Sequence, residues 1–424
     1  QDAAALGAEG YLSRTAPMTE PIVEASAGLY AFTWEEHGIR MLIDRMHEDS
    51  RGVVTAEVLV KNTQGKQIYR GRNNLLSGRS KGDVAKECAK WVTLQHPLTM
   101  EALVTFAFST TIDRYREGEP AVALDRDGAS DHLDYRVSPL LQEGMPNLLF
   151  GQGGAGKTRL ALYVGMMVHG NLLKDDTGLE AEPGNVLYLD YETSREVMER
   201  HLRQLERGYG LSVKVPLLYR RCYHPLAQET QELQRIVADA NVQLVIVDSV
   251  GMACGGEPES AQVAVDYFRA LRTIGGTSLS LSHVTKGGEQ RAAFGSIYFM
   301  NYARSAWELQ AKREEGENLL TLGLFHRKVN DGPLHKPLGF TFTFGLEGTK
   351  VAKSDPYSDP DLSKGGQLPQ RIRATLKHKA FTAKELAQEL DARQNSIDQA
   401  LGRGLKNGSL LQLPNGKWAL LERE

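Results

Sequence analysis

The chain has 424 residues, of which 41% are hydrophobic and 24% are charged, and its formal net charge is −3. This length allows two or three domains, and the near-neutral charge excludes a chain that is basic throughout, so a nucleic-acid site would have to be a local patch. The three scattered cysteines (Cys88, Cys222 and Cys254) form no Cys-x-x-Cys pair, which argues against a disulfide scaffold or a zinc site and predicts a reducing, cytoplasmic location. No run of about 18 apolar residues and no signal-peptide pattern occurs, so we expect no membrane segment. Because the sequence begins with Gln1 rather than methionine, we expect residues to precede it.

The first third of the chain predicts a small α+β domain over residues 25–116, after a loose lead-in at 1–24. We assign this domain no function. Its basic residues could contact a phosphate backbone, although charge runs usually face water. These residues are Arg70, Arg72, Arg79 and Lys81. The predicted strands are 29–34, 39–43, 53–60 and 67–70, the predicted helices are about 81–93 and 98–116, and 117–138 is linker-like.

The strongest functional signal begins at residue 147, where an apolar run, a glycine-rich turn and a helical pattern follow one another. The turn matches Gly-x-x-x-x-Gly-Lys-[Ser/Thr], the loop that binds the phosphates of a nucleoside triphosphate; a plain strand-to-helix turn is the alternative. Glycines let backbone N–H groups face a phosphate, Lys157 can reach the β- and γ-phosphates, and Thr158 can ligate Mg²⁺. We therefore predict ATP and Mg²⁺ as ligands. The predicted binding residues are Gly151, Gln152, Gly153, Gly154, Ala155, Gly156, Lys157, Thr158 and Arg159.

Three further predicted strands end at polar residues. Glu192 follows the apolar run at 186–189, Asp248 ends the run at 242–247, and His283 follows the strand at 277–282. Strands that alternate with helices predict a doubly wound parallel sheet, which binds ligands at the carboxyl ends of its strands. We assign Asp248 to Mg²⁺, Glu192 to polarising the attacking water and His283 to sensing the γ-phosphate. The alternatives are that Asp248 is an ordinary carboxylate at a strand end, that Glu192 caps the next helix and that His283 is a structural histidine.

The phosphate loop and the three strand ends give four motifs in chain order: Gly-x-x-x-x-Gly-Lys-Thr, Leu-Tyr-Leu-Asp-Tyr-Glu, Val-Ile-Val-Asp-Ser and Ser-His-Val-Thr-Lys. In this order they resemble the RecA-like ATPases and, within them, the RepA-type hexameric replicative helicases related to DnaB. The resemblance covers about 135–350 and implies a RecA-like core at 139–351. It also implies a homo-oligomeric ring, commonly a hexamer, with ATP sites between subunits.

The same resemblance assigns residues outside the ATP-binding motifs. Arg304 and Lys328 become candidates to reach the nucleotide bound by a neighbouring subunit. The family has a second basic residue on the strand that would carry Lys328, and Asn330 stands at that position here. A surface salt bridge is the alternative for Arg304. The loops at 251–260 and 286–295 would line the channel of the ring. Lys286 and Arg291 in the second loop would grip single-stranded DNA; a plain surface loop is the alternative.

The last part of the chain predicts a separate module after a linker at 352–367. Residues 368–424 resemble a winged helix-turn-helix, with helical patterns at 369–377, 383–390 and 394–406 and a hairpin over 408–421. The module has ten Lys and Arg against six Asp and Glu. We expect it to bind duplex DNA, although winged helices also serve as protein–protein modules. The candidate contacts are Arg393, Gln394, Asn395, Gln399 and Arg403 on the third helix and Lys417 at the wing.

The sequence therefore predicts an ATP-hydrolysing, RecA-like motor: a ring-shaped DNA helicase or translocase which, by the resemblance, belongs to a plasmid, phage or mobile element. Two alternatives stay open. One is an ATP-gated DNA-binding regulator or loader that unwinds nothing, and the other is a RecA-like recombinase that forms filaments.

Overall fold

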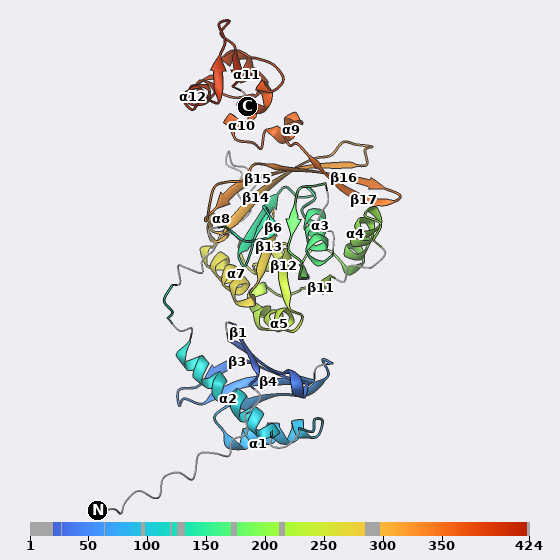
Figure 1. Ribbon diagram of the computed structural model, residues 1–424, viewed down its shortest axis with the longest axis vertical. Helices are drawn as coiled ribbons and strands as arrows, with labels where there is room; N and C mark the ends of the chain where they lie inside the picture. Colours follow the sequence, from blue (N-terminus) through green and yellow to red (C-terminus); the bar gives the residue numbers. More distant parts are fainter. Residues whose placement is uncertain are drawn as a thin grey trace, which may run out of the picture. The chain divides into compact units, whose positions relative to one another are not determined.

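The computed structural model describes residues 20–26, 28–62, 64–94, 98–118, 121–124, 132–170, 176–211, 217–284 and 297–421. The chain forms two compact units, Gln1–Ala129 and Ser130–Glu424 (Figure 1). Within the described ranges, no helix has both the length and the apolar character that a bilayer-spanning helix needs.

The N-terminal unit is a five-stranded antiparallel meander with two helices packed on one face (Figure 1). The sheet begins with a short edge strand at Ile22, inside the residues predicted as lead-in, and helix α1 starts three residues before its predicted start. The side chains of Ser77 and Thr99 accept hydrogen bonds from the first turns of α1 and α2, so each helix starts at a capping residue. The elements are β1 (Ile22–Ser26), β2 (Leu29–Trp34), β3 (Ile39–Glu48), β4 (Val54–Asn62), β5 (Gln67–Asn74), α1 (Gly78–Ala89) and α2 (Met100–Glu117).

The second unit is built on a nine-stranded sheet with the order β11-β10-β12-β13-β8-β14-β15-β16-β17. The six strands from β11 to β14 are parallel and the remaining three continue the sheet antiparallel. A mixed α/β unit with a large, mainly parallel sheet confirms the coarse fold prediction. The strands are β8 (Pro146–Gly151), β10 (Asn185–Asp190), β11 (Leu218–Arg221), β12 (Val242–Asp248), β13 (Thr277–Ser282), β14 (Ser305–Lys312), β15 (Leu319–Val329), β16 (Leu338–Gly345) and β17 (Gly348–Ser354).

Helices cover both faces of this sheet, which explains why its central strands β8, β10, β12 and β13 are buried along nearly their whole length. Helices α3 (Lys157–His169) and α4 (Arg195–Gly208) pack on one face, and α5 (Leu226–Asp239) and α7 (Ala261–Ile274) pack on the other (Figure 1). The shorter elements are α6 (Val250–Ala253), α8 (Ile297–Tyr302) and a small sheet of β6 (Tyr135–Ser138), β7 (Leu141–Gln142) and β9 (Glu180–Ala181). Strand β6 therefore occupies the end of the predicted 117–138 linker.

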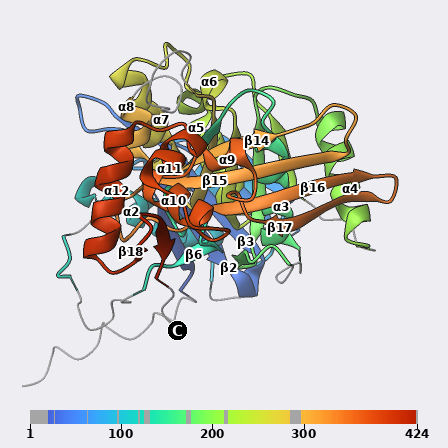
Figure 2. The same ribbon diagram turned by 90° about the horizontal axis from the view of Figure 1, so that it is seen from above.

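The C-terminal part of this unit contains three helices followed by a two-stranded hairpin, in the predicted order; Figure 2 shows α12 beside α11 and β18. Ile372, Leu386, Ile397 and Leu410 form its apolar core. The predicted linker at 352–367 contains the end of β17 and the short helix α9 (Pro360–Ser363). The identity of residues 368–424 as a winged helix stays a prediction. The elements are α10 (Leu368–Leu376), α11 (Ala383–Glu389), α12 (Gln394–Lys406), β18 (Leu410–Gln412) and β19 (Trp418–Leu420).

His326 of β15 is buried beside two aromatic rings. Its ring is stacked on Trp307 with 4.2 Å between ring centroids, and the ring of His335 lies 5.4 Å from it. The Nδ1 atom accepts a hydrogen bond from the backbone N–H of His335 (3.0 Å), so the neutral ring carries its proton on Nε2, which lies 3.1 Å from the Ser305 hydroxyl. Burial, with a smaller effect of His335, lowers the pKa of His326 to about 4.

We expect this histidine to make the second unit sensitive to acid. The unfolded chain binds a proton at His326 below about pH 6.5 and the folded chain only near pH 4, so its contribution to stability is complete above pH 6.5 and lost as the pH falls toward 4. Through this group, the free energy of unfolding should fall by about 2 kcal/mol between pH 8 and pH 5. Urea unfolding measured at pH 8 and at pH 5 should show a smaller fall in the free energy of unfolding for His326→Gln than for the wild type. The same substitution at the exposed His378 should leave the fall unchanged, and an undiminished fall in His326→Gln would contradict the assignment.

Candidate nucleotide-binding site

The glycine-rich loop joins β8 to α3 in the middle of the sheet. A Cβ atom at Gly151 would lie 2.5 Å from the carbonyl oxygen of Leu309 on β14, so only glycine allows the two strands to approach this closely. Gly156 has a φ of 93°, and a Cβ there would lie 2.8 Å from Leu320. The loop thus delivers the N-terminus of α3, whose first backbone N–H groups have no acceptor within the helix, to the carboxyl edge of the sheet, where an anion is favoured.

Lys157 lies folded back over this loop. Its ammonium group donates hydrogen bonds to the carbonyl oxygens of Gly151 (3.0 Å) and Gln152 (2.9 Å). Burial lowers the pKa of Lys157, whereas the negative charges of Asp248 and Glu192 act in the opposite direction. A buried cation surrounded by loop carbonyls and N–H groups is suited to binding a phosphate.

Thr158 and Asp248 meet across the site. The Thr158 hydroxyl donates to Oδ2 of Asp248 at 2.6 Å, and the hydroxyl of Tyr188 donates to the same oxygen at 2.7 Å. Asp248 is buried at the end of β12, and burial raises its pKa while these two hydrogen bonds lower it. Tyr188 is a site residue that the sequence analysis missed, because it reads as one more apolar position within a buried strand.

One carboxylate and one hydroxyl form a partial set of oxygen ligands, which suits Mg²⁺ bound jointly by a protein and substrate phosphates. Among the described residues, no group of three or more His, Cys, Asp and Glu side chains could hold a metal ion by itself. The residues present therefore fit a metal that arrives with its nucleotide.

Glu192 lies just beyond β10, and its side chain is 37% exposed. Its Oε1 atom accepts a hydrogen bond from the Ser249 hydroxyl and lies 3.5 Å from Nε2 of His283. His283 in turn lies beside the phosphate loop, since a Cβ at Gly153 would be 3.8 Å from its ring. The ends of β10, β12 and β13 thus bring Glu192, Ser249 and His283 to one place. Ser249 was not predicted, although it directly follows the strand-ending Asp248.

An aromatic ring and two arginines form a second feature beside the loop. The guanidinium group of Arg159 lies 4.6 Å from the ring centroid of Phe344, and that of Arg313 lies 5.8 Å from the same ring. Burial lowers the pKa of Arg159, and the charges of Arg313 and Arg200 lower it further. Phe344 and Arg313 were missed because β14 to β17 are far from the loop in the sequence and reach it only through sheet pairing.

The two candidates for action on a neighbour differ in their surroundings. Lys328 donates hydrogen bonds to the carbonyl oxygens of Met300 (2.8 Å), Asn301 (2.6 Å) and Ala303 (2.6 Å) at the end of α8. These bonds favour a structural role for Lys328 within its own chain. Arg304 is half-buried just before β14. The action of either residue on a neighbouring nucleotide stays a prediction.

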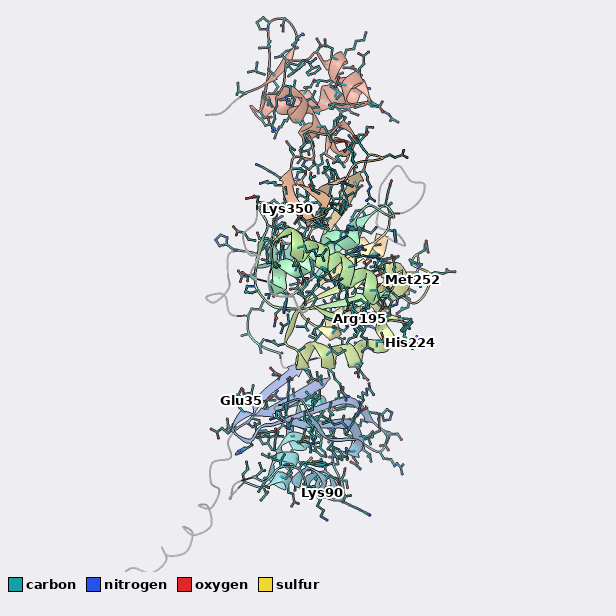
Figure 3. All side chains as sticks on the ribbon, turned by 90° about the vertical axis from the view of Figure 1, so that its right-hand side faces the viewer. Glu35, Lys90, Arg195, His224, Met252 and Lys350 are labelled. Carbon is teal, nitrogen blue, oxygen red and sulfur yellow. The ribbon has the colours of Figure 1, made fainter. Side chains whose placement is uncertain are left out.

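The predicted nucleic-acid residues fall into two groups. Lys286 and Arg291 lie outside the described residues. The third-helix candidates lie on or directly before α12 with exposed side chains, and Lys417 is half-buried at the turn between β18 and β19; the exposed residues are Arg393, Gln394, Asn395, Gln399 and Arg403. Helix α6 takes up the start of the predicted loop at 251–260, and its Met252 is 63% exposed and projects from the surface (Figure 3). Glu257 and Glu259, further along this segment, are exposed as well. This charge makes the 251–260 loop a poor binder of phosphates.

Comparison with known proteins supports the nucleotide site. Residues 114–289 match the family model described as an AAA domain, a segment that contains the phosphate loop, Glu192, Asp248 and His283. No curated protein matches the chain. One matching solved structure is a KaiC-like protein from the hyperthermophilic archaeon Pyrococcus horikoshii OT3, with 17% identity, a TM-score of 0.37 and coverage of 52% of this chain and 94% of that chain. Similarity at this identity and TM-score supports no conclusion about this chain. The match to the AAA domain model and the geometry of the site support an ATPase domain with a phosphate-binding loop.

The site predicts different outcomes for two substitutions. Glu192→Gln should keep ATP binding but slow hydrolysis at least about tenfold, because the amide cannot accept a proton from water. Lys157→Ala should abolish hydrolysis and weaken binding, because it removes the cation that binds the phosphates. Steady-state hydrolysis and titration with a fluorescent ATP analogue measure both effects. Turnover near the wild-type rate in either variant would contradict the assignment.

Proposed function

We propose that the chain is an ATP-hydrolysing, RecA-like motor that moves along DNA as a ring-shaped helicase or translocase. The observation that best supports hydrolysis is the Thr158–Asp248 hydrogen bond beside Lys157 and Glu192, since it joins the phosphate loop to the strand-ending carboxylate. The match to an AAA domain over the same residues supports it independently.

The residues divide the work of phosphoryl transfer. Lys157 and the loop N–H groups bind and orient the β- and γ-phosphates, and Thr158 and Asp248 hold Mg²⁺, which when bound neutralises charge on the phosphate oxygens. Glu192 orients the attacking water and accepts its proton, while its Oε1 atom is held by Ser249. Phe344, with Arg159 and Arg313, offers a flat cationic surface for the base of the nucleotide.

Movement along DNA is supported by the resemblance of the four motifs to the RepA-type hexameric helicases and by the exposed polar and basic side chains of the C-terminal helix α12. Exposed amide and guanidinium groups on α12 are the side-chain types that read base edges in a major groove. The same observation favours a second candidate function, an ATP-gated regulator or loader that binds duplex DNA without unwinding it. A recombinase that forms filaments is a third candidate, and helical polymers on DNA instead of closed rings would favour it.

The response of ATP hydrolysis to nucleic acid separates the first two functions. We expect single-stranded DNA to stimulate hydrolysis several-fold at about 50 mM salt and to lose this effect at about 200 mM, because phosphate contacts release counterions. Hydrolysis is measured without nucleic acid, with single strands and with duplex. Stimulation by duplex alone, or by neither, would contradict the motor and favour the regulator.

A mixing experiment tests whether Arg304 serves the site of a neighbouring subunit. Arg304→Ala and Glu192→Gln should each be nearly inactive alone. Mixed in equal amounts, they should regain about a quarter of the wild-type rate, because about one interface in four would then join an intact Glu192 to an intact Arg304. No recovery in mixed rings would contradict action in trans.

A further inference from the structure

Asp190, two residues before Glu192, is completely buried and surrounded by hydrogen-bond donors. Its Oδ1 atom accepts from the backbone N–H groups of Glu192 (2.9 Å) and Thr193 (2.8 Å) and from Nη1 of Arg221 (3.1 Å). Its Oδ2 atom accepts from the hydroxyls of Thr193 (2.8 Å) and Tyr219 (2.9 Å). Burial acts to raise the pKa of Asp190, but the hydrogen bonds outweigh it and the pKa is lowered, so the carboxylate is ionised.

These bonds define the turn in which the chain leaves β10. A carboxylate that accepts the N–H groups two and three residues ahead fixes the backbone in one conformation, and here those two N–H groups belong to Glu192 and Thr193. The same carboxylate has no capacity left to activate water. The two acids at this strand end thus have different environments, one buried and saturated and the other partly exposed beside the phosphate loop.

Of the three donors that remain, the Thr193 hydroxyl belongs to the same turn, and the other two come from the edge strand of the sheet. In the parallel pairing of β10 with β11, Arg221 lies opposite Asp190 and Tyr219 lies opposite Tyr188. Arg221 is 30% exposed and its guanidinium group lies over the ring of Tyr223, so it reaches Asp190 from the surface. Strand β11 therefore supplies the countercharge that a buried carboxylate requires.

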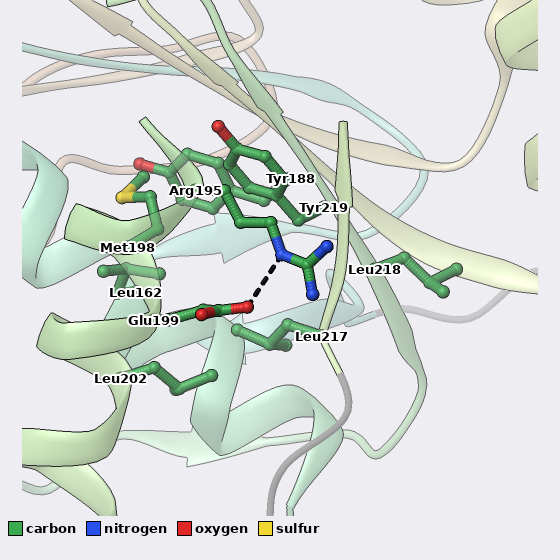
Figure 4. A pocket seen from close by; sticks show the side chains of 9 residues that line it. All are labelled: Leu162, Tyr188, Arg195, Met198, Glu199, Leu202, Leu217, Leu218 and Tyr219. Carbon is green, nitrogen blue, oxygen red and sulfur yellow. Dashed lines mark hydrogen bonds and ion pairs between the residues drawn. The ribbon is translucent and has the colours of Figure 1, made fainter. Parts of the chain in front are cut away.

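The two tyrosines of this pairing also border a cavity. Their rings form part of the wall of a space of about 300 Å³ (Figure 4), which is otherwise lined by Leu162, Arg195, Met198, Glu199, Leu202, Leu217 and Leu218. The hydroxyl of Tyr219 donates to Asp190 and that of Tyr188 donates to Asp248, so each of these paired tyrosines contacts one of the two buried carboxylates at the strand ends.

We propose that Asp190, braced by Arg221 and Tyr219 of β11, is a positioning residue that sets where Glu192 lies in the site. It does so without touching the substrate, through the backbone of Glu192 and Thr193. This inference rests on the proposed ATPase function. Contacts with the phosphates come from β8 and α3, so loss of the brace lowers the hydrolysis rate and leaves nucleotide binding intact.

Two neighbouring arginines on β11 give a matched test. Arg221→Met removes the countercharge of Asp190 and keeps most of the side chain, and Arg220→Met removes an ion pair of the same kind with Glu229 (2.8 Å) on α5. We expect Arg221→Met to lower kcat for ATP hydrolysis about tenfold, with KM for ATP changed less than about twofold. Arg221→Lys should restore part of the rate, and Arg220→Met should keep the wild-type rate. An unchanged kcat in Arg221→Met, or equal losses in both methionine variants, would overturn the inference.

Hydrogen exchange provides a readout that does not depend on catalysis. The amides of Glu192 and Thr193 should exchange at least about tenfold faster in Arg221→Met than in the wild type or in Arg220→Met. Unchanged exchange at these two amides would overturn the inference whether or not ATP is hydrolysed. A wild-type chain that hydrolyses no ATP would overturn the proposed function instead, and the exchange result would still decide whether Arg221 fixes this turn.

Discussion

The hydrogen bond between Thr158 and Asp248 joins two segments that are 90 residues apart in sequence, and it depends on the order of the parallel strands. Strand β8 lies between β13 and β14, with β12 and β10 next in line, so the loop after β8 and the ends of β10, β12 and β13 face the same edge of the sheet. Apolar packing on both faces of the sheet fixes that order. The site is therefore a product of sheet topology more than of any local sequence.

Three carboxylates near this edge illustrate how surroundings assign roles to chemically similar groups. Asp248 is buried but faces the hydroxyls of Thr158 and Tyr188, which leaves it suited to a cation. Asp190 is saturated by five donors and holds a turn. Glu192 is the most exposed of the three and the one placed beside His283. The number and direction of neighbouring donors, rather than sequence position, distinguish them.

Local pattern was enough to predict the elements whose signal is local. The glycine-rich loop, the aliphatic run that became β12, the alternating Ser-Leu stretch that became β13 and the main helices were predictable, because each carries its own periodicity or turn chemistry. Partners that depend on strand pairing were not: Tyr188, Ser249, Arg221 and Phe344 acquire their positions only when particular strands become neighbours. Short elements such as β1 and α9 were missed for a related reason, since a few residues carry too little periodicity.

The brace on Glu192 comes from β11, which pairs on one side only and forms the rim of the sheet. Mutations there would alter how fast the nucleotide is consumed while its affinity stays under the control of β8 and α3. Substitutions in β11 would thus allow the rate of ATP hydrolysis to change during evolution while the residues that bind ATP stay the same.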